Sequence, residues 1–235
     1  MARPRAAYIT ERFEAIYGPR EQAEIAELVE LVGPPATPAT IADLPGWLSE
    51  VEVILSGWGA PVLDARFLDA CPRLRAFLYG AGSVRGIVTE AFWQRDIALS
   101  SAWAANAVPV SEYALATFLL SLKRFWSSAQ AVRRDRAYPD RLAERVPGAY
   151  GSVVGLVSLG MVGRLVAERL KPFDVHVVAY DPFVSPADAG KLGVELVTLT
   201  ELFARADVVS LHTPWLPETV RLITGSLISS MKPYA

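Results

Sequence analysis

Short apolar runs alternate with helical patterns along nearly the whole chain, and this alternation restricts the possible folds more than any other feature. Strands are predicted over residues 6–10, 51–56, 74–79, 97–100, 152–158, 175–180, 194–197 and 207–211. Helices are predicted over residues 21–32, 64–70, 89–94, 110–124, 161–170, 199–204 and 226–231. A repeated strand–helix order predicts parallel sheets covered by helices on both faces, which is the α/β class.

The middle of the chain divides this pattern into two domains, residues 1–108 and 109–235. Residues 110–124 are apolar nearly all round, which predicts a buried helix. The polar stretch that follows contains Pro139 and Pro147 and is predicted to connect the helix to a second set of alternating strands and helices.

Charge and composition argue against a nucleic-acid partner. The 235 residues carry a formal net charge of −2, whereas phosphate binding favours a clustered basic surface. The only basic cluster, Arg133, Arg134 and Arg136, is interrupted by Asp135, and a solvated helix end is the preferred interpretation.

Targeting features point to a soluble cytoplasmic protein without a membrane partner. Residues 1–13 lack the apolar core of a signal peptide. The longest apolar stretch, residues 114–122, is far shorter than the roughly 20 residues of a membrane helix. The single cysteine, Cys71, cannot form an internal disulfide and fits a reducing compartment.

A glycine turn in the second half carries the first recognisable chemistry. The predicted strand 152–158 runs into Ser158-x-Gly160-x-x-Gly163, which opens a predicted helix. The free N–H groups and positive dipole end of such a helix bind a pyrophosphate. Serine replaces the usual first glycine and would cost about 1–2 kcal/mol in a left-handed conformation. The alternative is a tight strand–helix turn without a ligand.

An acid at the end of the next predicted strand strengthens the dinucleotide interpretation. Asp181 follows Gly163 at close to the roughly 20-residue spacing expected of the carboxylate that binds the adenosine ribose. This carboxylate would repel a 2′-phosphate, so NAD is predicted over NADP. The alternative role for Asp181 is a helix or turn cap before Pro182.

Several motifs, in order, resemble the D-isomer-specific 2-hydroxyacid dehydrogenases. They are Gly80–Gly82, Asn106–Glu112, Gly155–Arg164, Tyr180–Pro182, Ala206–Pro214, Leu216–Thr219 and Met231–Pro233. The resemblance implies a flavodoxin-like substrate domain and a doubly wound Rossmann dinucleotide-binding domain. Tyr113 and the segment Ser83–Arg85 depart from the family pattern, which puts the identity of the substrate in doubt.

The resemblance also implies site residues. Ala81 and Gly82 would donate backbone N–H groups to a substrate carboxylate, and Asn106 would bind substrate. Cofactor-binding roles fall on Ser158, Gly160, Met161, Val162, Gly163, Asp181, His212, Thr213 and Pro214. The alternatives are a plain turn at residues 80–82 and a helix cap at Asn106.

The family's catalytic arginine, glutamate and histidine come after the Met-Lys-Pro motif, where this sequence stops. The chain contains two histidines: His176 is expected in mid-strand, and His212 belongs to a cofactor motif. No catalytic or metal-binding residue is therefore predicted. We expect an inactive fragment with an incomplete Rossmann sheet, ending at the edge strand 207–211.

The predicted function is hydride transfer between NAD(H) and a small 2-hydroxy or 2-keto acid. One alternative is an NAD(H)-binding regulator of the corepressor type, without catalysis. Another is a relative of adenosylhomocysteine hydrolase, which the motifs at Gly80–Gly82 and Asn106–Glu112 argue against. The full-length protein is predicted to form a homodimer around the apolar helix that begins near Val110.

Overall fold

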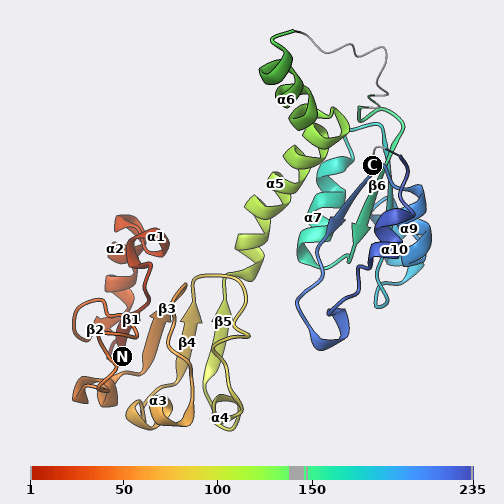
Figure 1. The fold of residues 1–235 in the computed structure, drawn as a ribbon. Helices are drawn as coiled ribbons and strands as arrows, with labels where there is room; N and C mark the ends of the chain where they lie inside the picture. Colours follow the sequence, from red (N-terminus) through yellow and green to blue (C-terminus); the bar gives the residue numbers. More distant parts are fainter. Residues whose placement is uncertain (1, 138–145, 147, 234) are drawn as a thin grey trace. The chain divides into compact units, whose positions relative to one another are not determined.

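A computed structural model describes residues 2–137, 146, 148–233 and 235 of the chain. The chain divides into two compact units, Met1–Asn106 and Ala107–Ala235. Figure 1 shows one parallel sheet in each unit. The assignment of the first unit to substrate stays a prediction.

The first unit contains a five-stranded parallel sheet. Its strands are β1 (Arg5–Ile9), β2 (Glu30–Leu31), β3 (Val53–Ser56), β4 (Ala76–Tyr79) and β5 (Ala98–Ser101). They lie in the order β2-β1-β3-β4-β5, which is the flavodoxin-like order. The four predicted strands of this half are confirmed, and the expected architecture follows from them.

Helices cover both faces of this sheet. They are α1 (Phe13–Ile16), α2 (Pro19–Leu28), η1 (Gly46–Glu50), α3 (Ala65–Ala70) and α4 (Glu90–Trp93). On one face Ile54, Phe77 and Phe92 are fully buried in the larger core cluster. On the other face Tyr8 and Tyr17 pack with their ring centroids 5.0 Å apart. The expected helices at 64–70 and 89–94 are confirmed as α3 and α4.

The predicted helix over residues 21–32 is wrong in its last four residues. Helix α2 ends at Leu28, and Val29 is already extended, with φ −128° and ψ 162°. Glu30 then donates its N–H to the Pro4 carbonyl at 2.9 Å, which begins β2. Pairing with a distant strand overrides the local helical periodicity, because an edge strand supplies hydrogen bonds that the periodicity cannot anticipate.

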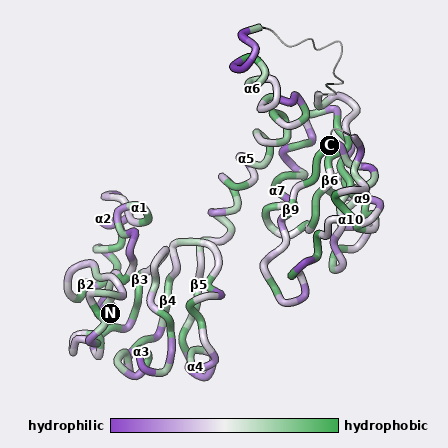
Figure 2. Tube along the Cα trace, in the orientation of Figure 1, coloured by the Kyte–Doolittle hydropathy of each residue, from purple (hydrophilic) through white to green (hydrophobic). Residues whose placement is uncertain are grey.

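The second unit contains a four-stranded parallel sheet. Its strands are β6 (Ser152–Val157), β7 (Val175–Tyr180), β8 (Val194–Leu196) and β9 (Val208–Leu211). Their order, β8-β7-β6-β9, corresponds to 3-2-1-4 of the doubly wound Rossmann fold. In Figure 2 the hydrophobic colour follows β6, whose residues are nearly all buried, as expected for a central strand covered on both faces.

Helices flank this sheet on both sides. They are α5 (Trp103–Leu122), α6 (Phe125–Asp135), α7 (Met161–Leu170), α8 (Pro186–Lys191), α9 (Leu199–Arg205), η2 (Pro217–Thr219) and α10 (Gly225–Ser229). Residues of α5, α7 and α8 share one buried cluster with Leu156 of β6. Residues of α9 and α10 pack around Val157 on the opposite face. The two-sided cover matches the predicted Rossmann architecture.

Strand β9 is an edge strand among the described residues, because its only strand partner is β6. A groove of about 560 Å³ runs beside it. Apolar side chains, including Val208, Phe203 and Ile223, supply much of its lining. The expected unpaired edge at 207–211 is therefore present in the described chain.

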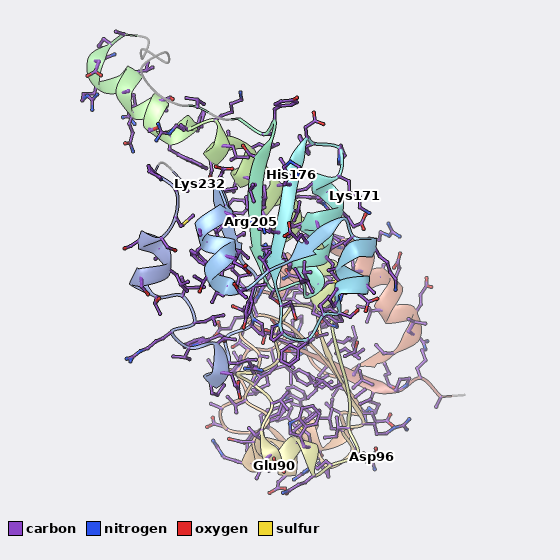
Figure 3. The ribbon with its side chains drawn as sticks, turned by 90° about the vertical axis from the view of Figure 1, so that its right-hand side faces the viewer. Glu90, Asp96, Lys171, His176, Arg205 and Lys232 are labelled. Carbon is purple, nitrogen blue, oxygen red and sulfur yellow. The ribbon has the colours of Figure 1, made fainter. Side chains whose placement is uncertain are left out.

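Asp207 anchors the beginning of this edge. Its Oδ2 accepts the N–H of Val153 at 2.8 Å, and its Oδ1 lies 2.9 Å from Nζ of Lys232. Lys232, labelled in Figure 3, comes from the Met-Lys-Pro motif. Two of the family-like motifs thus have structural roles, holding β9 to β6 and to the segment after α10.

The prediction that the helix near residue 110 is buried is wrong. Helix α5 begins at Trp103, contains Pro109, and buries only a stripe that includes Ser111, Ala114 and Phe118. Tyr113 is 75% exposed and Leu120 38% exposed. Apolar composition on all sides does not create a second packing partner, and among the described residues α5 buries one stripe against the second sheet's core.

The basic cluster lies at the end of α6, whose start at Phe125 the sequence did not predict. Arg133 and Arg134 occupy its last turn and are exposed, which confirms the interpretation as a solvated helix end. Figure 2 shows this end of α6 as hydrophilic. Pro139 and Pro147 lie outside the described residues. None of the described helices has both the length and the apolar character needed to cross a bilayer.

Candidate functional site

The turn between β6 and α7 presents free backbone donors. Gly160 is the N-cap residue of α7, and no side chain caps the helix start. The first-turn N–H groups of Met161 and Val162 have no acceptor within the helix, because the four leading amides of any helix lie beyond its own carbonyls. These amides and the dipole of a ten-residue helix form an arrangement suited to an anion.

The two glycines of this turn are required for different reasons. A Cβ at Gly163 would lie 2.2 Å from the Ser158 carbonyl oxygen, so the fold itself excludes a side chain there. A Cβ at Gly160 would meet nothing nearer than Ser158 Oγ at 3.7 Å, and its φ of −67° suits any residue. The open space above Gly160 therefore fits a ligand pyrophosphate.

Asp181 lies immediately after β7 and is hydrogen-bonded to the same turn. Its Oδ2 accepts the N–H of Leu159 at 2.8 Å and the hydroxyl of Ser158 at 3.2 Å. Its Oδ1 accepts the N–H of Phe183 at 2.9 Å. The turn-cap alternative is thus partly correct. The carboxylate is also only half-buried, which leaves it accessible to a ribose hydroxyl.

His212 follows β9 and borders the glycine turn. Its backbone N–H donates to the Val157 carbonyl at 2.9 Å, and its side-chain Cδ2 lies 3.9 Å from the position of a Cβ on Gly163. The Nε2 atom is buried without a hydrogen-bond partner in the described structure. Burial lowers the pKa of His212, so the imidazole is neutral at pH 7. An unpartnered buried nitrogen beside the glycine turn fits a site that a ligand completes.

The sheet brings these groups together. Strand β6 lies between β7 and β9, and Asp181 and His212 follow the carboxyl ends of those two neighbours. The strand order reverses at β6, and doubly wound sheets bind ligands at this point. Thr213 and Pro214 continue from His212, and the Pro214 carbonyl is held by the Thr219 hydroxyl at 2.7 Å. The predicted cofactor residues of the second unit thus share one edge.

The first unit has a second turn at the carboxyl edge of its sheet. The Gly80 N–H donates to the Ser56 carbonyl at 2.8 Å. The next two N–H groups, of Ala81 and Gly82, have no hydrogen-bond partner among the described residues. The Asn106 side chain reaches this turn, with Nδ2 3.3 Å from a Cβ position on Gly82. The three predicted substrate residues therefore cluster.

The helix-cap alternative for Asn106 is wrong. Asn106 lies inside α5 and donates its own N–H to the Ala102 carbonyl at 2.9 Å, as an interior helical residue does. Its side chain is exposed, so it is available to a substrate.

Sequence reasoning missed residues that support the turns. The Tyr17 hydroxyl donates to the Ser56 carbonyl at 2.7 Å and backs Gly80. The Arg164 Nε donates to the Leu159 carbonyl at 2.8 Å within the glycine turn. An arginine in the first helical turn after a glycine fingerprint is a usable signal, whereas nothing local connects Tyr17 with Gly80.

His176 lies near the amino end of β7 with an exposed side chain (Figure 3). It therefore stands at the opposite end of its strand from Asp181. Across the part of the chain that the structure describes, no three His, Cys, Asp or Glu side chains gather as metal ligands would.

Comparison with known proteins identifies the family. Residues 115–235 match the model of the D-isomer specific 2-hydroxyacid dehydrogenase, NAD binding domain. The D-3-phosphoglycerate dehydrogenase of Mycobacterium bovis is 37% identical over 174 residues, which cover 74% of this chain and 33% of that protein. The chain belongs to the D-isomer specific 2-hydroxyacid dehydrogenase family. Its cofactor is NAD, and the adenosylhomocysteine hydrolase alternative is wrong.

Solved structures show the same fold. A phosphoglycerate oxidoreductase from Rhizobium etli aligns with a TM-score of 0.75 and 22% identity over 98% of this chain and 69% of its own. The NAD-complexed D-isomer specific 2-hydroxyacid dehydrogenase of Lactobacillus delbrueckii aligns with a TM-score of 0.77 and 17% identity over 97% and 68%. The chain spans about a third of the length of the curated relatives it matches. These relatives give no support to the corepressor alternative.

Proposed function

We propose that the two units serve an oxidoreductase that transfers hydride between NAD(H) and a small 2-hydroxy or 2-keto acid. The observation that carries the proposal is the edge where Gly160, Asp181 and His212 meet. Backbone donors, an accessible carboxylate and an unpartnered imidazole nitrogen converge there. Family membership supplies the reaction class.

In the second unit, each group would hold a different part of NAD. The amides of Met161 and Val162 would bind the pyrophosphate above Gly160. Asp181 would accept hydrogen bonds from the adenosine ribose. The neutral His212 would use Nε2 to bind the cofactor, with Thr213 and Pro214 beside it. The nicotinamide supplies the hydride chemistry when bound.

In the first unit, the free N–H groups of Ala81 and Gly82 would bind the substrate carboxylate. Two adjacent amides match the two oxygens of a carboxylate, and the Asn106 amide could donate to a further substrate oxygen. Asn106→Ala should weaken binding of a 2-keto acid such as pyruvate about tenfold, since one hydrogen bond to a charged or polarised oxygen is lost. Unchanged pyruvate affinity would remove Asn106 from the site.

Neither histidine of the described chain stands in a position that we assign to proton transfer. His176 lies at the wrong end of its strand, and His212 belongs to the cofactor edge. We therefore assign no catalytic acid or base to these residues.

A homodimer through α5 and α6 is also part of the proposal. Leu119, Leu120, Phe125 and Val132 line a groove of about 650 Å³, and Phe125 is 50% exposed. An apolar surface of this kind on two neighbouring helices favours a protein partner. Sedimentation equilibrium should show a dimer that Leu120→Glu converts to monomer, and a monomeric wild type contradicts the proposal. A cytoplasmic location, supported by the single buried thiol of Cys71, completes it.

Cofactor preference tests the central assignment. Calorimetry on the 235-residue chain should show NAD binding about tenfold or more tighter than NADP, because Asp181 attracts ribose hydroxyls and repels a 2′-phosphate. Asp181→Asn removes the charge at nearly constant shape and should abolish most of this preference. Equal affinities in the wild type would refute the role of Asp181.

A further inference from the structure

Ser158 occupies the position of the first glycine in the dinucleotide fingerprint and carries a side chain where the backbone disfavours one. Its φ is +84°, in the left-handed region that glycine adopts most easily. Its hydroxyl donates to Asp181 Oδ2 at 3.2 Å and accepts the Gly160 N–H at 3.4 Å. The hydroxyl therefore joins the pyrophosphate turn to the ribose carboxylate.

We propose that Ser158 is a positioning residue that determines cofactor specificity, because its hydroxyl fixes the Asp181 carboxylate in the orientation that accepts NAD and rejects NADP. This inference rests on the proposed role of Asp181 in binding the ribose. Ser158 itself need not touch the cofactor.

The geometry around the carboxylate explains how this would work. Oδ2 is held from the turn by Leu159 N–H and the Ser158 hydroxyl, and Oδ1 is held by Phe183 N–H. Three donors on two oxygens fix the plane of the carboxylate and leave its remaining lone pairs for ribose hydroxyls. A fixed carboxylate also cannot rotate away from a 2′-phosphate, so its charge opposes NADP at full strength.

Loss of the hydroxyl leaves the Leu159 and Phe183 bonds in place but removes one of the three donors that fix the half-buried carboxylate, so its orientation is held less firmly. NAD affinity should then fall while NADP affinity rises. Because one of two charge-assisted bonds to Oδ2 is removed, the preference for NAD should drop about three- to tenfold.

Two substitutions separate the hydroxyl from the backbone strain. Ser158→Ala removes the hydroxyl and keeps a Cβ at positive φ, whereas Ser158→Gly removes both. We expect the same drop in preference in both variants, measured by calorimetry with NAD and NADP on the 235-residue chain. The melting temperature should fall for alanine and stay level or rise for glycine. A preference that follows the melting temperature would overturn the proposal, because it would indicate a structural role only.

A double-mutant cycle and a matched control complete the test. In an Asp181→Asn background, Ser158→Ala should no longer change the preference, since the carboxylate it positions is absent. Ser185→Ala removes another hydroxyl in contact with a carboxylate, that of Asp188 at 2.8 Å, and should leave the preference unchanged.

The outcomes distinguish the inference from the proposed function. A wild type that does not discriminate the cofactors overturns both. A wild type that prefers NAD, with both Ser158 variants retaining the full preference, overturns the inference alone.

Discussion

The two turns at the carboxyl edges of the sheets differ in what lies behind them. Behind Gly163 is the backbone carbonyl of Ser158, whereas behind Gly82 is the end of the Asn106 side chain. The turn in the second unit also opens a ten-residue helix, and the first-unit turn after β4 does not. A turn supported by backbone and a helix dipole suits the fixed pyrophosphate of a cofactor. A turn supported by a side chain can be adapted to different substrates.

The largest effect is expected at Gly163. Gly163→Ala places a Cβ 2.2 Å from a backbone oxygen, so α7 must move away from β6. The free energy of unfolding should fall by about 3 kcal/mol, and NAD binding should be lost with it. Chemical denaturation measures the first effect and calorimetry the second. Gly190→Ala, with no atom within 4 Å of the new Cβ, is the control and should not destabilise the chain.

Gly160 should separate cofactor binding from stability. In Gly160→Ala the new Cβ meets no protein atom closer than 3.7 Å, so the free energy of unfolding should change by less than about 1 kcal/mol. The dissociation constant for NAD should rise about tenfold or more, because the methyl group occupies the space above the free amides. Unchanged NAD affinity would mean that the pyrophosphate binds elsewhere.

The turn at Gly80–Gly82 in the first unit should tolerate an added side chain better than the turn at Gly163. In Gly82→Ala the Cβ lies 3.3 Å from Asn106 Nδ2, at the end of a side chain that can move. We expect a loss of less than about 1 kcal/mol in unfolding free energy. Adding Asn106→Ala should remove even this loss. If Gly82→Ala proves as costly as Gly163→Ala, the contrast between the two turns is wrong.

The smallest expected effect is a pH dependence confined to the second unit. Burial lowers the pKa of His212, so below its ordinary value of about 6.5 the unfolded chain takes up a proton that the folded chain does not. Stability should therefore fall as the pH drops from 6.5 toward the folded pKa. The melting temperature of the wild type should decrease more between pH 7.5 and 5.5 than that of His212→Gln. Both histidines lie in the second unit, so amide exchange in the first should not show this change.

The strands and the cofactor edge could be predicted because their signals are local. Apolar runs predict the strands, and the position of Ser158 at the first glycine of the fingerprint predicts its positive φ. The turn at Gly80–Gly82, and the placement of Asp181 and His212 beside the glycine turn of the second unit, also follow from motifs in the sequence. Each of these signals is a short run or a motif at a set spacing, so none depends on knowing which distant segments touch.

The errors came from contacts distant in sequence. Strand β2 forms because Glu30 pairs with Arg5, which no helical periodicity reveals. The apolar sequence of α5 did not reveal which of its sides other segments pack against. The contact between Gly82 and Asn106 required the motif resemblance to place both residues, and the tyrosine behind Gly80 had no signal at all.

The parallel pairing of β6 and β9 has a consequence for synthesis and folding. Val153 of β6 is hydrogen-bonded to Asp207 across 54 residues, and neither neighbour of β6 can be reached by a hairpin because both pair with it in parallel. The five strands of the first sheet, by contrast, are complete by residue 101. During translation the first sheet can therefore form before β9, the second partner of β6, has been synthesised. Pairing across such a separation is slow, but the first sheet pairs Ala6 with Val53 across a similar one, so the second unit should complete its folding last because it is synthesised last.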